Sequence, residues 1–294
     1  MACWIVRTPL PTESARYLGG AALVTVAFIG LYLFFVTSHA GQSADQLAYD
    51  GAQFGRRSVT PFTRGVLDSV PSVAVVLALL VTGVIAVLRR NWRTLVVALV
   101  VAAVAVLSAQ LLKYGVLDRP YLGVPGYAGN SFPSGHTTVA AASALVVFLV
   151  AGPRLRPILA VAGTAFAVLA GVATLANQWH RPSDVIASLL VVAFWGCVGG
   201  AVLAWPRNGA GTDAPANTQR TRLALPRAAT FTRLLRVLLV PFATIAGLAL
   251  AATFLFEFGE SASLFVAYLG GVTAIVTAGL TLALTGIRMF SRLP

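Results

Sequence analysis

The stretch TLVVALVVAAVAVLSAQLL, residues 94–112, contains nineteen consecutive residues without a charge. An α-helix of this length spans roughly 28 Å, close to the roughly 30 Å hydrocarbon core of a bilayer. Lipid offers backbone amides no hydrogen-bond partner, so a segment that crosses a membrane in this way must be helical. Arg93 precedes the stretch and Lys113 follows it. The stretch therefore predicts a transmembrane helix with a cation at each end.

Seven further stretches resemble this one and also lack Asp, Glu, Lys and Arg: residues 17–38, 69–88, 137–153, 157–179, 185–206, 237–256 and 261–287. Hydrophobic residues make up 58% of the 294 residues, charged residues make up 10%, and mean hydropathy is +0.85. An ordinary soluble domain is about one quarter charged. The composition excludes a soluble domain, a disordered chain and a secreted disulfide scaffold. We expect an all-α, polytopic membrane helix bundle.

Two longer polar stretches interrupt this pattern. Residues 39–68 predict an outer loop, with room for a short interfacial helix. Residues 208–226 are rich in Gly, Ala, Thr, Asn and Pro, which favours a flexible linker. The chain is therefore expected to have three parts: a six-span core over 1–206, a cytoplasmic linker over 207–232, and two additional transmembrane helices over 233–294.

A cleaved signal peptide is an alternative for the first stretch, because Ser38-His39-Ala40 resembles a cleavage site. The apolar core of that stretch is longer than a typical signal peptide has. This length favours a retained helix.

The net charge of +12 predicts an orientation. If the N-terminus is cytoplasmic, the segments on that side carry fifteen basic and two acidic residues, and the opposite segments carry six basic and seven acidic ones. Cytoplasmic loops are enriched in Lys and Arg. We therefore expect both termini in the cytoplasm. The basic residues occur in short clusters between apolar runs, a pattern that does not favour a nucleic-acid partner.

Three polar segments are expected on the outer face: residues 113–120, 130–137 and 179–184. In the first, Lys113 and Arg119 place two cations near a helix end, and an arginine can bind phosphate through two parallel hydrogen bonds. In the second, Pro133 followed by Ser134 and Gly135 is typical of a helix start. The free amides and positive dipole end of a helix start favour a bound anion.

Histidines occur in the second and third segments. His136 lies at the predicted helix start, where it can donate a proton to a leaving oxygen. His180 and Asp184 are four residues apart, so on one helical turn the carboxylate can hold one imidazole nitrogen and leave the other as a nucleophile. Each feature alone has a plain structural explanation, such as a snorkelling lysine or a helix cap. Together they favour a phosphate-handling site on one face of the membrane.

The three segments resemble the motifs of the type 2 phosphatidic acid phosphatase family of integral membrane lipid phosphatases. The family pattern has three parts: Lys and Arg-Pro, then Pro-Ser-Gly-His, then Ser-Arg followed by His and Asp. The second part matches in full at residues 133–136, and His180 with Asp184 keeps the spacing of the third. The resemblance covers roughly the first six spans and leaves the last two outside.

The resemblance implies a role for each matching residue. Lys113, Arg119, Ser134 and the Gly135 amide would hold the phosphate oxygens. His180, oriented by Asp184, would attack phosphorus and form a phosphohistidine. His136 would protonate the departing lipid oxygen and later activate water. Enzymes of this family need no metal ion and no cofactor.

The chain departs from the family pattern at two places. Five residues separate Lys113 from Arg119, whereas the family has six. In an α-helix this difference rotates the lysine by about 100°. The Ser-Arg of the third part would fall at Ala173 and Thr174, so one cation is missing. Arg181, beside the expected nucleophile, is the nearby residue that can replace it.

The resulting prediction is a lipid phosphatase of the cytoplasmic membrane with an outward-facing active site, whose partners are a lipid phosphate substrate and membrane lipids. A polyprenyl pyrophosphate is favoured, because an outward-facing site suits recycling of a cell-wall carrier lipid, and phosphatidylglycerol phosphate and phosphatidic acid are the other candidates. A lipid phosphotransferase and a catalytically impaired lipid-phosphate-binding protein are the alternatives. Glycines on the sixth and eighth spans leave a homo-oligomer open. A transporter has the least support, because the spans lack charges at the membrane midplane.

Overall fold

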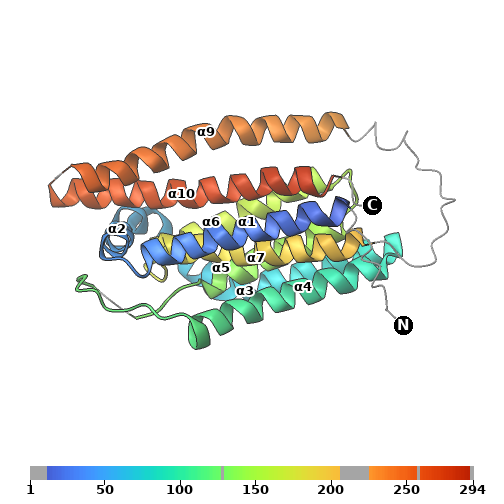
Figure 1. Ribbon diagram of the computed structural model, residues 1–294, viewed down its shortest axis with the longest axis horizontal. Coiled ribbons are helices and arrows are strands. Elements are labelled where there is room, and N and C mark those ends of the chain that lie inside the picture. The colour runs from blue at the N-terminus through green and yellow to red at the C-terminus, as the bar shows by residue number, and fades with distance from the viewer. Residues whose placement is uncertain (1–11, 127–128, 206–224, 257–258, 292–294) are drawn as a thin grey trace, which may run out of the picture.

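The computed structural model describes residues 12–126, 129–205, 225–256 and 259–291, and within these ranges it is all-helical, without strands (Figure 1). This confirms the predicted fold class. Its helices are α1 Thr12–Phe35, α2 His39–Asp50, α3 Gln53–Arg89, α4 Trp92–Leu111, the π-helix η1 Leu112–Val116, α5 Gly135–Val150, α6 Arg156–Ala176, α7 Pro182–Ala204, α9 Leu225–Leu255 and α10 Glu260–Met289.

Each of the eight predicted spans coincides with one of these helices. Six helices in the described ranges are long and apolar enough to cross a membrane: Ser14–Phe35, Trp92–Val116, Arg156–Ala176, Pro182–Ala204, Ala229–Leu255 and Glu260–Met289. The second and fourth predicted spans correspond to the shorter apolar segments Val75–Arg89 and Gly135–Val150. The chain is thus a multi-pass helical membrane protein.

Two predicted boundaries differ from the structure. The predicted linker over 207–232 ends earlier than expected, because α9 begins at Leu225; the rest of it, up to residue 224, lies outside the described residues. Pro226 is compatible with this start, since the first turn of a helix needs no amide donor. The predicted outer loop over 39–68 is largely helical: it forms α2 and the first part of α3.

The helices surround α5, which contacts α3, α4, α6 and α7. On one side α1 packs against α7, and α10 packs against α6, α7 and α2, with α9 covering α10 (Figure 1). The last two helices are therefore an integral layer of the bundle. We call the end where α4 terminates and where α5 and α7 begin the site end; α2 lies there, at the left of Figure 1.

The glycines of α10 pack against helices of the same chain. A Cβ atom added at Gly270 would lie 3.0 Å from Ala249, and one at Gly279 would lie 2.3 Å from Val168. At Gly271 the added atom would lie 2.6 Å from Cγ of Pro182 and 3.3 Å from Cβ of Ala48. The proline ring cannot rotate away, so α10 approaches the start of α7 this closely only through a glycine.

We expect Gly271→Val to lower the melting temperature of the detergent-purified protein, because overpacking of this kind costs about 1–3 kcal/mol. Gly247→Val on α9 is the matched control, since an added Cβ there meets nothing within 4 Å. Thermal unfolding of both variants followed by circular dichroism makes the comparison. Equal melting temperatures would show that α10 does not pack this closely on α7.

Candidate active site

The three polar segments meet at the site end of the bundle. Arg119 lies between η1 and α5, Ser134 and His136 lie at the start of α5, and His180 lies just before α7. Nη2 of Arg119 is 3.3 Å from Oδ1 of Asp184, and the Ser134 amide donates a hydrogen bond of 3.0 Å to the Asp184 carbonyl. The rings of His136 and His180 are 6.4 Å apart between centroids. The structure thus brings these predicted site residues together around Asp184.

Asp184 holds His180 in one orientation. Oδ2 of Asp184 is 3.3 Å from Nδ1 of His180, and the carboxylate is fully buried. The same oxygen accepts hydrogen bonds from the Ser131 hydroxyl at 2.6 Å and from the Arg181 amide at 2.9 Å. A carboxylate beside Nδ1 favours the tautomer that carries the proton there. Nε2 of His180 then keeps its lone pair and can act as a nucleophile.

Helix α7 begins at Pro182, so His180 precedes its first turn. Asp184 lies in that turn and binds the amide of Arg181, the residue that caps the helix. The predicted contact between His180 and Asp184 therefore forms across the N-terminal cap of α7, and not within one turn of a helix. This geometry fixes the carboxylate by backbone contacts as well as by side chains.

Arg119 is 4% exposed and has two carboxylates beside it. Besides Asp184, its Nη2 atom lies 3.4 Å from Oδ2 of Asp45 and 3.4 Å from the Ser183 hydroxyl. Asp45 also accepts hydrogen bonds from the Ser183 amide at 3.1 Å and from the Ser183 hydroxyl at 2.6 Å. Sequence reasoning missed Asp45, which lies on α2, because no spacing relates that helix to Arg119.

Burial raises the pKa of Asp45 to about 6. The positive charge of Arg119 acts in the opposite direction, and the negative charge of Asp184 adds to the effect of burial. Removing a carboxylate from water disfavours its charged form. Asp45 is therefore a counter-ion whose charge depends on Arg119.

The Ser134 side chain caps α5. Its hydroxyl oxygen accepts a hydrogen bond from the Thr137 amide at 3.4 Å, and its carbonyl accepts one from the Ser188 hydroxyl at 2.7 Å. The predicted helix start is confirmed, because α5 begins at Gly135. Amides in the first turn of a helix have no partner within the helix, so this end of α5 can receive an anion.

Arg181 is 3% exposed and is held by neutral groups. Its Nε and Nη2 atoms donate to Oε1 of Gln46 at 3.0 and 2.7 Å, and Nη1 donates to the Ser131 hydroxyl at 3.1 Å. The guanidinium carbon lies 5.3 Å from the ring centroid of Tyr49. Within the described ranges, no carboxylate forms an ion pair with the Arg181 guanidinium.

Ala173 and Thr174 stand where the family pattern has Ser-Arg, and Thr174 has a structural role in this chain. Thr174 is fully buried, and its hydroxyl donates to the Gly171 carbonyl at 2.7 Å. Its own carbonyl accepts hydrogen bonds from the amides of Trp179 at 2.9 Å and His180 at 3.4 Å. The C-terminal end of α6 therefore shapes the turn that carries His180 but supplies no cation.

Lys113 is the predicted residue that the structure leaves apart from the others. Its Nζ atom lies 5.4 Å from the ring centroid of Tyr114, and in the described part of the chain its ammonium forms no hydrogen bond or ion pair with another predicted site residue. The segment is a π-helix, closed by a hydrogen bond of 2.8 Å from the Leu117 amide to the Leu112 carbonyl. The rotation expected for an α-helix therefore does not apply.

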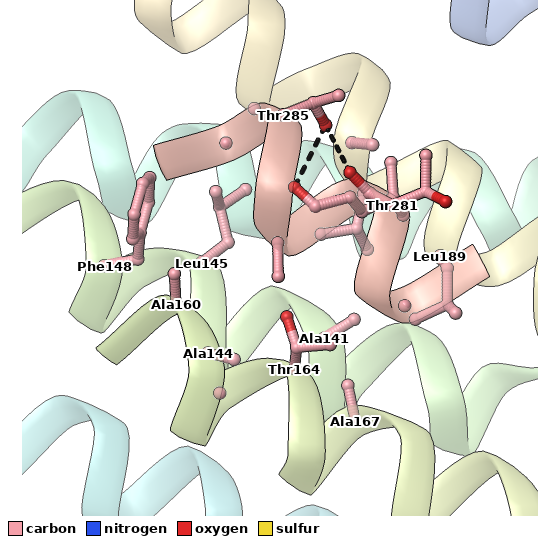
Figure 2. A pocket seen from close by; sticks show the side chains of 18 of the residues that line it. Ala141, Ala144, Leu145, Phe148, Ala160, Thr164, Ala167, Leu189, Thr281 and Thr285 are labelled. Atoms are coloured by element: carbon pink, nitrogen blue, oxygen red, sulfur yellow. Dashed lines mark hydrogen bonds between the residues drawn. The ribbon is translucent and has the colours of Figure 1, made fainter. Parts of the chain in front are cut away.

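An apolar cavity of about 320 Å³ lies deeper in the bundle, between α1, α5, α6, α7 and α10 (Figure 2). Its first lining residue on α5 is Ala141, roughly 9 Å along the helix from Gly135. None of its lining residues is charged. The hydroxyls of Thr281 and Thr285 bond to carbonyls of their own helix. This cavity is separate from the histidines and offers no group for phosphate chemistry.

Residues 94–208 match a family model described as the PAP2 superfamily. The match begins in the first turn of α4, includes α5, α6 and α7, and contains all three polar segments. No curated protein and no solved structure matches the chain. Helices α1 to α3, α9 and α10 lie outside the matched region. The motifs and the match agree: residues 94–208 are similar to the PAP2 superfamily, and they form part of a multi-pass helical membrane protein.

Proposed function

We propose that this protein is a lipid phosphatase that hydrolyses a phosphomonoester or pyrophosphate of a membrane lipid through a phosphohistidine on His180. One observation carries the proposal: His180, oriented by the buried Asp184, lies near His136, with 6.4 Å between the ring centroids. A phosphoryl group placed between the two rings has a nucleophile on one side and a proton donor on the other. This is the arrangement that an in-line displacement at phosphorus requires.

The first step forms a bond between phosphorus and Nε2 of His180 and breaks the bond between phosphorus and the lipid oxygen. His136, in its protonated form, gives its proton to that oxygen. The lipid therefore leaves as an alcohol from a phosphomonoester, or as a lipid monophosphate from a pyrophosphate. In the second step His136 takes a proton from water, and the oxygen of that water attacks phosphorus. The bond to His180 then breaks, and inorganic phosphate leaves.

The negative charge of the transition state lies on the equatorial phosphoryl oxygens, so cations and free amides supply most of its stabilisation. Two carboxylates already compensate the charge of Arg119. The Arg181 guanidinium bonds to Gln46 and Ser131 and, in the described part of the chain, forms no direct ion pair with a carboxylate. We therefore assign to Arg181 the part of the missing family arginine, together with the amides at the start of α5.

For the substrate we retain the order of preference derived from the topology. A polyprenyl pyrophosphate used in cell-wall construction comes first, and phosphatidylglycerol phosphate and phosphatidic acid follow. The charge distribution supports a site on the outer face of the cytoplasmic membrane, with both termini inside.

The detergent-purified protein should release phosphate from at least one of these three lipids in the presence of a chelator. His180→Ala should lose this activity, because the nucleophile is removed. The exposed His39 on α2 provides the matched control, and His39→Ala should keep wild-type rates. A phosphorylated organic product without free phosphate would favour the phosphotransferase. Complete inactivity of a folded protein would favour lipid-phosphate binding alone.

Arg181→Ala should raise the Michaelis constant or lower turnover by about 10- to 100-fold, since hydrogen bonds to charged groups contribute about 1.5–3 kcal/mol. The measurement is steady-state phosphate release with the preferred lipid. Arg56→Ala is a suitable control at the same end of the bundle, because Arg56 is exposed and bonds to the Gln178 side chain at 3.1 Å. Unchanged kinetics in Arg181→Ala would remove this residue from the phosphate site.

A further inference from the structure

We propose that α2, which lies outside the PAP2 superfamily region, positions the cationic part of the phosphate site, and that Gln46 is the positioning residue for Arg181. This inference rests on the proposed function, since it concerns the same site. It extends that proposal by assigning a role to residues that no family motif contains.

Gln46 holds Arg181 without neutralising it. The buried Gln46 side chain accepts two hydrogen bonds from Arg181 through Oε1, at 3.0 and 2.7 Å. Its Nε2 atom donates to Oδ1 of Asp50 at 2.9 Å, which directs the amide oxygen towards the arginine. A neutral carbonyl can therefore fix the guanidinium plane without forming an ion pair with it, which leaves the guanidinium able to pair with an incoming phosphate.

The same helix also holds Arg119. Asp45, the residue before Gln46, contacts Arg119 at 3.4 Å and binds the Ser183 amide in the first turn of α7 at 3.1 Å. Tyr49, one turn further along α2, lies against the Arg181 guanidinium and donates a hydrogen bond to the Gln178 carbonyl. Adjacent positions on one short helix thus fix both buried arginines.

Arg181 is connected in turn to the nucleophile. Its Nη1 atom donates to the Ser131 hydroxyl at 3.1 Å, and that hydroxyl donates to Oδ2 of Asp184 at 2.6 Å. Asp184 orients His180 through the same oxygen. A displacement of Arg181 therefore moves the guanidinium proposed to contact phosphate. It also disturbs Ser131, which bonds to the carboxylate that orients His180.

The last two helices support α2 in this position. Gly271 of α10 lies directly against Ala48 of α2 and Pro182 of α7, and a Cβ atom added at Gly51 would lie 2.1 Å from the Leu264 carbonyl of α10. Because Ala48 is two residues from Gln46 and Pro182 follows Arg181, α10 braces both partners of this hydrogen-bonded pair. This gives the C-terminal helices a role in the geometry of the site.

A double-mutant cycle tests the proposal, with Gln46→Ala, Arg181→Ala and the combination of both assayed for phosphate release. Gln46→Ala should raise the Michaelis constant about tenfold with a smaller effect on turnover. In the Arg181→Ala background, the same substitution should change the Michaelis constant by less than about twofold, since Gln46 acts through Arg181. Fully multiplicative effects would show that Gln46 acts independently and would overturn the proposal.

Gln46→Glu separates positioning from simple structural support. The new carboxylate keeps an acceptor for Arg181 but forms an ion pair with it. The Michaelis constant should therefore be raised relative to the wild type, as in Gln46→Ala, while the melting temperature stays at the wild-type value. Asp50→Asn is added to this variant to remove repulsion between the two carboxylates. A wild-type Michaelis constant in the double variant Gln46→Glu, Asp50→Asn would contradict the proposed need for an Arg181 that forms no ion pair with a carboxylate.

Stabilisation by inorganic phosphate provides a readout that needs no turnover. A bound ligand raises the melting temperature, and we expect phosphate to do so for the wild type and for His180→Ala. Gln46→Ala and Arg181→Ala should both reduce this shift. An active, His180-dependent enzyme whose Gln46→Ala variant keeps wild-type kinetics and phosphate stabilisation would overturn this inference and leave the proposed function intact. If the wild type releases no phosphate from any lipid but Gln46→Ala still loses the phosphate-induced shift, this inference is supported and the proposed phosphatase activity is contradicted.

Discussion

The carboxylate of Asp184 is the group on which the site depends. It is fully buried and receives contacts from Arg119, Ser131, His180 and the amide of Arg181. A buried charge is costly unless it is paired and hydrogen-bonded. The two ends of the connection between η1 and α5 must therefore meet the start of α7 for this carboxylate to be tolerated. The same convergence brings the two histidines close to each other.

The two buried arginines differ in their partners, and this difference affects what each can do. Arg119 lies between Asp45 and Asp184, so its charge mainly stabilises the acidic groups around it. Arg181 lies between an amide, a hydroxyl and an aromatic ring. In a low-dielectric setting, a cation without a carboxylate partner attracts an incoming anion more strongly. The departure from the family pattern at Thr174 is thus compatible with a complete phosphate site.

The motif spacing predicted the central part of the site because its contacts are local. His180 and Asp184 are close in the sequence and meet at a single helix start, and the Pro-Ser-Gly-His run predicted the beginning of α5. The role of Lys113 stays a prediction, and spacing did not reveal that this residue lies in a π-helix at the end of α4. Ser131 lay within a recognised segment, but nothing in its neighbourhood indicated that it bridges Arg181 and Asp184.

The sequence by itself determined the all-helical membrane architecture, because an uncharged stretch of about twenty residues has no alternative to a helix in lipid. It also predicted a nucleophile, its orienting carboxylate and a proton donor. Only the tertiary structure decided which residues hold the arginines. Asp45 is 74 residues from Arg119 and Gln46 is 135 residues from Arg181. The second pair lies where α10 packs against both α2 and the start of α7. Contacts at such separations depend on the packing of whole helices, which leaves no periodic signal in the chain.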